Sequence, residues 1–105
     1  MAEQSRAQQL VGRIAPKLAE LTDEVLFGDV WARPGLARRD RSLITVAALA
    51  ALGRTEQLRS HLGLALDNGL SQEELAEAAT HLAFYAGWPA GMTTATTLQE
   101  VLNSR

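Results

Sequence analysis

The chain has 105 residues and a formal net charge of −2, with 47% apolar and only 5% aromatic residues. This length suits one domain, and the balanced charge offers no basic surface for nucleic acid or for an anionic membrane. The absence of cysteine excludes disulfides, thiolate nucleophiles and cysteine-ligated metals within the chain.

We therefore predict a single domain over residues 1–105, with a core of Ala, Leu, Val and Ile side chains. The longest apolar run, at 43–52, is far shorter than the about 20 residues of a membrane span. The N-terminal residues do not combine a positive flank with an apolar run. A cytoplasmic protein with neither nucleic-acid nor membrane partners is the expectation.

The first third of the chain predicts short helices. Apolar residues recur at helical spacing from Ser5 to Leu21, and Pro16 within this segment predicts a kink or a break. Thr22 or Asp23 is expected to cap a short second helix. Residues 31–36 then contain a Pro-Gly step, which predicts a turn or loop.

A third helix is expected from Arg41 to Leu52, with Asp40 as its N-cap and Gly53 at its end. This helix is apolar nearly all round. Such a helix is buried on most of its sides, so we expect it at the centre of the fold or at a subunit interface.

Three more helices complete the predicted fold. Thr55 is expected to cap a fourth helix that ends near Asn68, and Ser71 begins a capping box that opens a fifth. Pro89 suits the first turn of a sixth helix that ends near Leu102. No segment alternates with period two over the length of a strand. The fold class is therefore predicted as all-α, a compact bundle of about six helices.

The two histidines have different predicted settings. His61 faces the apolar side of its helix, with Glu56 on another face, and is either a hydrogen-bonded core residue or a proton-transfer group. His81 shares one helix face with Glu77, four residues before it, and Tyr85, four residues after it. These three side chains form either a proton-transfer unit or a solvated edge.

Several kinds of site have no support in the sequence. The spacings HxH, HxxxH and HExxH are absent, so we expect no metal site. The absence of GxGxxG, GxxxxGK[ST] and GxSxG likewise argues against nucleotide binding and serine hydrolysis.

Positive charge is concentrated in one place, at Arg33, Arg38, Arg39 and Arg41. These arginines either form a solvated loop or supply one or two guanidiniums that bind a substrate carboxylate. Trp88 lies in a short Trp-Pro loop, where it either closes the end of the helical core or walls a pocket for a flat ligand.

Five segments together resemble one known family. They are DVWARPGL (29–36), RSLITVAALAALGR (41–54), EQLRSHL (56–62), NGLSQEELAEA (68–78) and THLAFYAGWPAG (80–91). In this order and spacing they are similar to the carboxymuconolactone decarboxylase family, within the alkylhydroperoxidase D-like superfamily, over about residues 20–102.

The resemblance implies an all-α fold and a homo-oligomer, usually a trimer or hexamer. The redox branch of the superfamily uses a CxxCxxxH motif. Here His61 matches the motif's histidine, while Arg54 and Gln57 stand at the two cysteine positions and Ser42 replaces an upstream glutamate. The chain therefore resembles the decarboxylase-type members and not the thiol peroxidases.

The activity implied by the resemblance is removal of CO₂ from a carboxylated lactone of the 4-carboxymuconolactone type, or from a related enolisable acid. Because the electron pair left behind delocalises onto the lactone carbonyl, we expect no cofactor. The reaction needs cations that hold carboxylates, donors that stabilise an enolate oxygen, and a proton donor to carbon.

Candidate residues exist for each of these roles. The proton donor is expected to be His61 or His81, oriented by Glu56 or Glu77. Arg41 or Arg33 is expected to hold the carboxylate. Tyr85 and Trp88 are expected to wall the pocket of this small-molecule substrate.

Two other functions stay open on the same fold. One is a non-catalytic oligomeric module that binds a small molecule, in which His61 would pack in the core and His81 would face water. The other is a natural-product tailoring enzyme that applies similar carbon-acid chemistry to a larger, flatter substrate.

Overall fold

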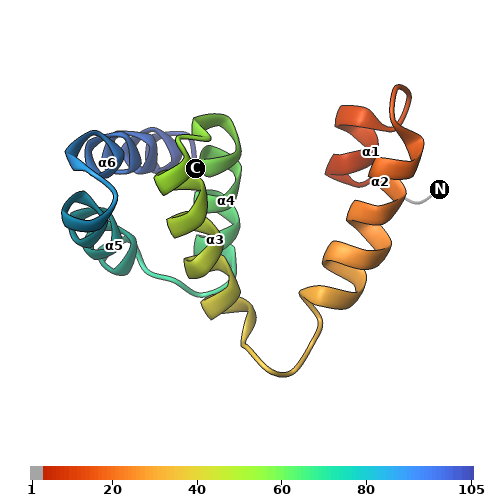
Figure 1. Ribbon diagram of the computed structural model, residues 1–105, viewed down its shortest axis with the longest axis horizontal. Helices are drawn as coiled ribbons and strands as arrows, with labels where there is room; N and C mark the ends of the chain where they lie inside the picture. The colour runs from red at the N-terminus through yellow and green to blue at the C-terminus, as the bar shows by residue number, and fades with distance from the viewer. Residues whose placement is uncertain (1–3) are drawn as a thin grey trace. The chain divides into compact units, whose positions relative to one another are not determined.

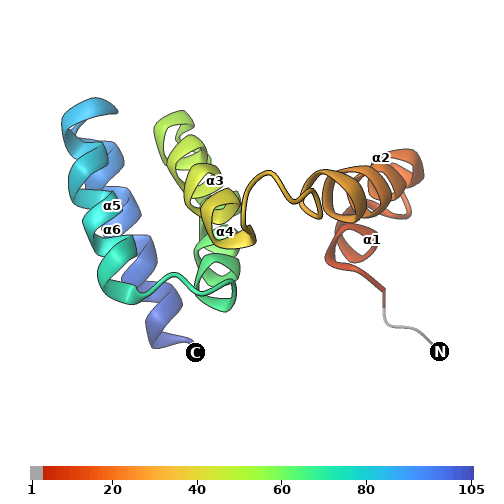
Figure 2. The same cartoon turned by 90° about the horizontal axis from the view of Figure 1, so that it is seen from below.

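The computed structural model describes residues 4–105, which form six α-helices and one π-helix (Figures 1 and 2). The prediction of an all-helical fold is confirmed for these residues. The chain divides after Leu36 into two compact units, each of which is described by itself. A single domain over residues 1–105 stays a prediction.

The first unit contains α1 (Arg6–Val11), α2 (Pro16–Leu21) and the π-helix η1 (Thr22–Val30). Pro16 is the first residue of α2, so the segment predicted as one helix is broken rather than kinked. The prediction that Thr22 or Asp23 caps the next helix is wrong, because η1 follows α2 without a gap. The Thr22 hydroxyl instead donates to the Leu18 carbonyl at 2.7 Å.

The first unit has a small core of its own. Among residues 4–36 the buried apolar side chains are Ala19 and Trp31, and the ring centroids of Trp31 and Phe27 lie 5.5 Å apart. The Ser5 hydroxyl accepts from the Gln8 amide at 3.1 Å. Eight larger apolar side chains are exposed: Leu10, Ile14, Leu18, Leu21, Val25, Leu26, Val30 and Leu36.

The second unit consists of four longer helices, namely α3 (Arg38–Leu52), α4 (Thr55–Asp67), α5 (Gln72–Tyr85) and α6 (Trp88–Asn103). The helices α3 and α4 pack as one hairpin and α5 and α6 as another, and α4 also packs on α6 (Figures 1 and 2). No helix among residues 4–105 is long and apolar enough to cross a membrane.

Aliphatic side chains from all four helices form the core of the second unit. Leu58 and Leu62 on α4 and Leu75 on α5 are at most 1% exposed. Burying a leucine side chain contributes about 1.5–3 kcal/mol, so these contacts dominate the stability of the unit. The buried cluster comprises Val46, Ala50, Leu58, Leu62, Ala65, Leu70, Leu75, Leu98 and Val101.

Some of the predicted helix ends are confirmed and others are displaced. Ser71 forms both halves of its capping box, and Pro89 lies in the first turn of α6. By contrast, α3 begins at Arg38, so Asp40 lies in its first turn and is not its N-cap. Thr55 is the first residue of α4 and does not cap it. Polar residues favoured as caps are also tolerated in the first turn, so the observed helix starts lie one to a few residues before the predicted ones.

The third predicted helix, α3, is buried on one face only within this chain. Ser42, Val46 and Ala50 are buried, whereas Ile44 is 57% and Leu52 is 70% exposed. The expectation that α3 is buried on most sides is therefore not met by the chain's own packing.

The hairpin of α5 and α6 depends on a close approach at Gly91. A Cβ atom on Gly91 would lie 2.7 Å from the Cβ of Ala83 and 2.9 Å from the carbonyl oxygen of Ala79. Neither neighbour is a flexible side-chain end, so the helices would have to move apart.

We predict that Gly91→Ala lowers the free energy of unfolding by about 1–3 kcal/mol through overpacking. The matched control is Gly63→Ala in the middle of α4, where the new Cβ meets only the Arg105 guanidinium at 3.6 Å. That substitution should stabilise the chain by up to about 1 kcal/mol, because alanine favours a helix interior. Urea denaturation of both variants checks the opposite signs, and equal destabilisation would contradict this packing.

Candidate functional site

Two of the predicted site residues, Glu77 and His81, line an open groove between α3 and α5 with a volume of about 500 Å³. The imidazole of His81 stacks on the ring of Tyr85, with centroids 4.8 Å apart. Both His81 and Tyr85 are exposed, Tyr85 at 80%. Glu77, His81 and Tyr85 therefore lie on one face of α5, as predicted, and this face is exposed to solvent. Five apolar side chains also line the groove: Leu43, Ala47, Leu70, Ala78 and Leu82.

The groove also contains Arg39, one of the four clustered arginines, whereas Arg41 or Arg33 was expected to hold the carboxylate. Its guanidinium forms an ion pair with Glu74 on α5 and a second one, at 3.3 Å, with Asp40. Sequence spacing alone could have found it, since Arg39 lies four residues before Leu43 on the same face of α3. Because Glu74 and Asp40 already neutralise Arg39, and Glu77 adds another carboxylate, the groove does not favour an anionic ligand.

The other histidine, His61, lies on α4 in a drier environment. It is partly buried beside Leu58 and Leu62, and its Nδ1 atom is shielded from solvent. Burial lowers the pKa of His61 below its ordinary value of 6.5, because the imidazolium form loses hydration. Perturbed titration of a partly buried histidine is a common property of catalytic sites, and it also occurs in structural cores.

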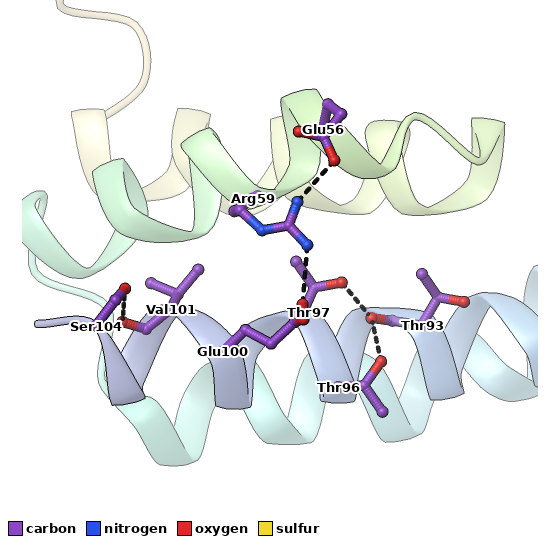
Figure 3. A network of polar contacts seen from close by, with 8 residues as sticks. All are labelled: Glu56, Arg59, Thr93, Thr96, Thr97, Glu100, Val101 and Ser104. Atoms are coloured by element: carbon purple, nitrogen blue, oxygen red, sulfur yellow. Dashed lines mark hydrogen bonds and ion pairs between the residues drawn. The ribbon is translucent and has the colours of Figure 1, made fainter.

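The Glu56 carboxylate forms an ion pair with Arg59 and was expected to orient a histidine. The Glu56 carboxylate accepts from Arg59 at 2.8 Å, and Arg59 also donates to Glu100 on α6 at 2.8 Å (Figure 3). The bonds to Glu100 and to Glu56 raise the pKa of Arg59 above its ordinary value. Glu56, with a side chain that is 82% exposed, therefore takes part in an ion-pair bridge between α4 and α6.

The two candidate arginines lie in different units of the chain. Arg41, in α3, is partly buried and its Nε atom is shielded from solvent. Arg33 is exposed and belongs to the first unit. Neither is among the residues that line the groove with His81.

Trp88 lines a different cavity from the groove of Glu77 and His81. It begins α6, is 59% exposed, and packs edge to face with Phe84 at 5.5 Å between ring centroids. The cavity beside it lies between α5 and α6 and has a volume of about 380 Å³. Tyr85 is not among the residues that line this cavity.

Among residues 4–105, no group of three or more histidine, aspartate or glutamate side chains is placed to hold a metal ion. The predicted site residues consequently fall into separate places. Glu77, His81 and Tyr85 lie together on α5, while His61, Glu56 and Arg41 lie outside their groove.

Comparison with known proteins gives the family. The model of the carboxymuconolactone decarboxylase family matches residues 16–100. The chain belongs to this family. It contains no cysteine, so this chain has no thiol with which to carry out cysteine chemistry.

Two relatives carry decarboxylase names. The chain is 52% identical over 64 residues to 4-carboxymuconolactone decarboxylase of Acinetobacter baylyi, an alignment that covers 61% of the chain and 48% of that protein. It is 36% identical over 84 residues to nitrosuccinic acid decarboxylase of Metarhizium robertsii, covering 80% of the chain and 59% of that protein. The chain thus matches about half the length of these relatives.

The burial of His61 predicts a pH dependence of stability. Because the folded chain lowers the pKa of His61 below 6.5, the unfolded chain binds more protons in the window just below pH 6.5. The free energy of unfolding should therefore fall as the pH drops below 6.5, and this contribution should level off below the folded-state pKa.

Urea denaturation between pH 5 and 8 measures this dependence, and His61→Gln should remove the part of the slope nearest pH 6.5. Carboxylates titrate mainly at lower pH, near 4, and so provide a separable background. An unchanged slope in His61→Gln would contradict the assignment.

Proposed function

We propose that the chain is a cofactor-free carboxy-lyase acting on a carboxylated lactone of the 4-carboxymuconolactone type or on a related acid. The observation that carries the proposal is the family match over residues 16–100, together with two relatives that are both named decarboxylases but differ in substrate. The chain is 52% identical to the first of them over the aligned residues, which favours the carboxylated lactone as the substrate.

The two substrate names share one kind of chemistry. Each describes an acid with two carboxyl groups, one of which can leave while the electron pair of its C–C bond delocalises onto a neighbouring acceptor. The acceptor is a lactone carbonyl in one case and a nitro group in the other. The carbanion equivalent is then protonated on carbon, so the protein needs only to bind carboxylates, stabilise negative charge and deliver a proton.

Within this mechanism we assign the proton transfer to His61. Its partial burial beside Leu58 and Leu62 reduces its contact with water, which strengthens electrostatic interactions with a developing charge. Burial alone lowers the pKa of His61. An anionic substrate nearby acts in the opposite direction, favouring the imidazolium that can give a proton to carbon.

Arg41 is the proposed partner that holds a substrate carboxylate. Its guanidinium is partly shielded from solvent, and a bidentate contact from arginine to carboxylate is strong in such a setting. The pair Glu77 and His81 is a weaker candidate for the chemistry, because the carboxylates of Glu74 and Glu77 would repel a dianion from their groove.

A non-catalytic small-molecule-binding module is the second candidate function. The specific observation in its favour is that His61 is partly buried among core leucines whereas His81 faces solvent, the arrangement expected of such a module. A natural-product tailoring enzyme has no observation of its own to favour it.

We further propose that the chain works as a homo-oligomer, a trimer or hexamer as the family resemblance implies. Exposed apolar side chains of the second unit support association, since a large apolar area on a small unit is best covered by another subunit. They are Ile44, Leu52, Phe84, Tyr85, Trp88 and Met92.

The proposed chemistry predicts that the chain converts 4-carboxymuconolactone to the enol-lactone with release of one CO₂ per turnover. His61→Asn should lower kcat by about 100-fold or more, the usual contribution of a positioned acid. His81→Asn is the matched substitution at the other histidine and should change kcat by no more than a few-fold. Loss of turnover in His81→Asn with activity retained in His61→Asn would reverse the assignment. Full turnover in both would contradict histidine catalysis.

The proposed assembly predicts that sedimentation velocity finds a species of three or six times the 11.3 kDa chain mass. Ile44→Glu on the exposed face of α3 should shift this species toward the monomer, because a buried carboxylate without a partner is costly at an interface. A monomer at all concentrations would contradict the assembly.

A further inference from the structure

A third pocket of the second unit contains none of the residues predicted for the site. It lies where the turn between α3 and α4 meets the first turns of α6, and its volume is about 370 Å³. It is lined by segment 49–55, by Leu58, and by Pro89, Ala90 and Thr93. All of these residues belong to one unit of the chain.

The turn that links α3 to α4 places Arg54 at this pocket. Gly53 adopts a left-handed conformation with φ +72°, and its amide donates to the Ala50 carbonyl at 3.2 Å. The Arg54 amide donates to the Leu49 carbonyl at 2.9 Å, and the Arg54 carbonyl accepts from Leu58 at 2.8 Å. These bonds form a Schellman turn that leads directly into α4. The backbone of Arg54 is therefore held at both sides, while its side chain stays exposed beside the pocket.

The charge of the pocket differs in sign from that of the groove between α3 and α5. No carboxylate is among its lining residues, and its polar side chains are the guanidinium of Arg54 and the hydroxyls of Thr55 and Thr93. Within residues 4–105, the Arg54 side chain has no hydrogen bond or ion pair. The carboxylate nearest in sequence, Glu56, is taken up by Arg59. An anion entering this pocket thus meets an arginine that forms no ion pair with any acidic residue of segment 4–105.

We propose that this pocket is a carboxylate-binding site in which Arg54 holds a carboxyl group of the substrate, the one that is retained. The inference rests on the proposed function and adds a substrate-binding residue to it. The apolar surfaces of Leu49, Leu58 and Pro89 suit the carbon skeleton of a small acid, and the guanidinium supplies the bidentate contact that carboxylates prefer.

The position of the pocket relative to His61 supports this role. Leu58 lines the pocket, and His61 follows it by three residues, so the two are neighbours on one face of α4. A substrate anchored at Arg54 would extend its other end along this face toward the proposed proton donor.

The test uses succinate, an unreactive dicarboxylate, as the probe in calorimetric titration of the full chain. Arg54→Gln should weaken succinate binding by about 10- to 100-fold, since a hydrogen-bonded ionic contact is lost. The succinate affinity of Arg54→Lys should lie between those of the unaltered chain and Arg54→Gln, because lysine keeps the charge without the bidentate geometry. Arg13→Gln is the matched control: Arg13 is exposed in the first unit, and its substitution removes the same charge. It should leave the affinity unchanged.

A second pair of variants tests the pocket without changing charge. Ala51 is exposed and lines the pocket, so Ala51→Phe should also weaken succinate binding. Ala48 is exposed on the same helix outside the lining, and Ala48→Phe should not. For turnover of 4-carboxymuconolactone, Arg54→Gln should raise KM by about 10- to 100-fold and change kcat by only a few-fold.

Wild-type affinity for succinate in Arg54→Gln, or no binding of succinate by the unaltered chain, would overturn the site whatever the activity. Failure of the proposed function looks different. If succinate binds through Arg54 but 4-carboxymuconolactone releases no CO₂, the carboxylate site stands and the decarboxylase activity does not.

Discussion

The second unit depends on the packing of α4 against both of its neighbours. Leu58 and Leu62 point into the shared core, so α4 is held between α3 of its own hairpin and α6 of the other. Arg59, on an outer face of the same helix, links α4 to α6 by an ion pair with Glu100. The apolar contacts supply most of the stability, while the exposed ion pair contributes less. The setting of His61 follows from this arrangement, since it lies between Leu58 and Leu62 in sequence and shares their burial in part.

The distribution of carboxylates decides which hollow of the unit suits an acidic ligand. In the groove between α3 and α5, Glu74 engages Arg39 and Glu77 leaves a surplus of negative charge. At the turn between α3 and α4, the pocket beside Arg54 is lined by apolar side chains and two threonine hydroxyls, with no carboxylate among its lining residues. Both hollows are partly apolar, and their volumes of about 500 and 370 Å³ are each large enough for a small acid, so size does not separate them. Electrostatic complementarity does, because it sets the sign of the ligand that each one attracts.

The helix pattern was largely predictable from the sequence, and the clustering of site residues was not. Residues four apart on one helix, such as Glu77 and His81, were correctly placed together because the helical repeat alone brings them to one face. Glu56 was expected to orient a histidine, yet it pairs with Arg59, and the third member of that bridge, Glu100, lies on another helix. Sequence spacing holds no information about such a contact. For the same reason the sequence marks Arg54 only as a residue at a cysteine position, although its neighbours in the pocket include Pro89 and Thr93 from α6.

By itself, the sequence determined the all-helical class, the capping box at Ser71, the left-handed turn at Gly53 and the absence of thiol chemistry, since all of these follow from local conformational preferences or from composition. Tertiary structure decided which charges neutralise each other, which face of α3 is covered, and which side chains surround each hollow. These outcomes depend on contacts between helices that are distant in the sequence. Such contacts are selected by the packing of the core as a whole, and no single segment encodes them.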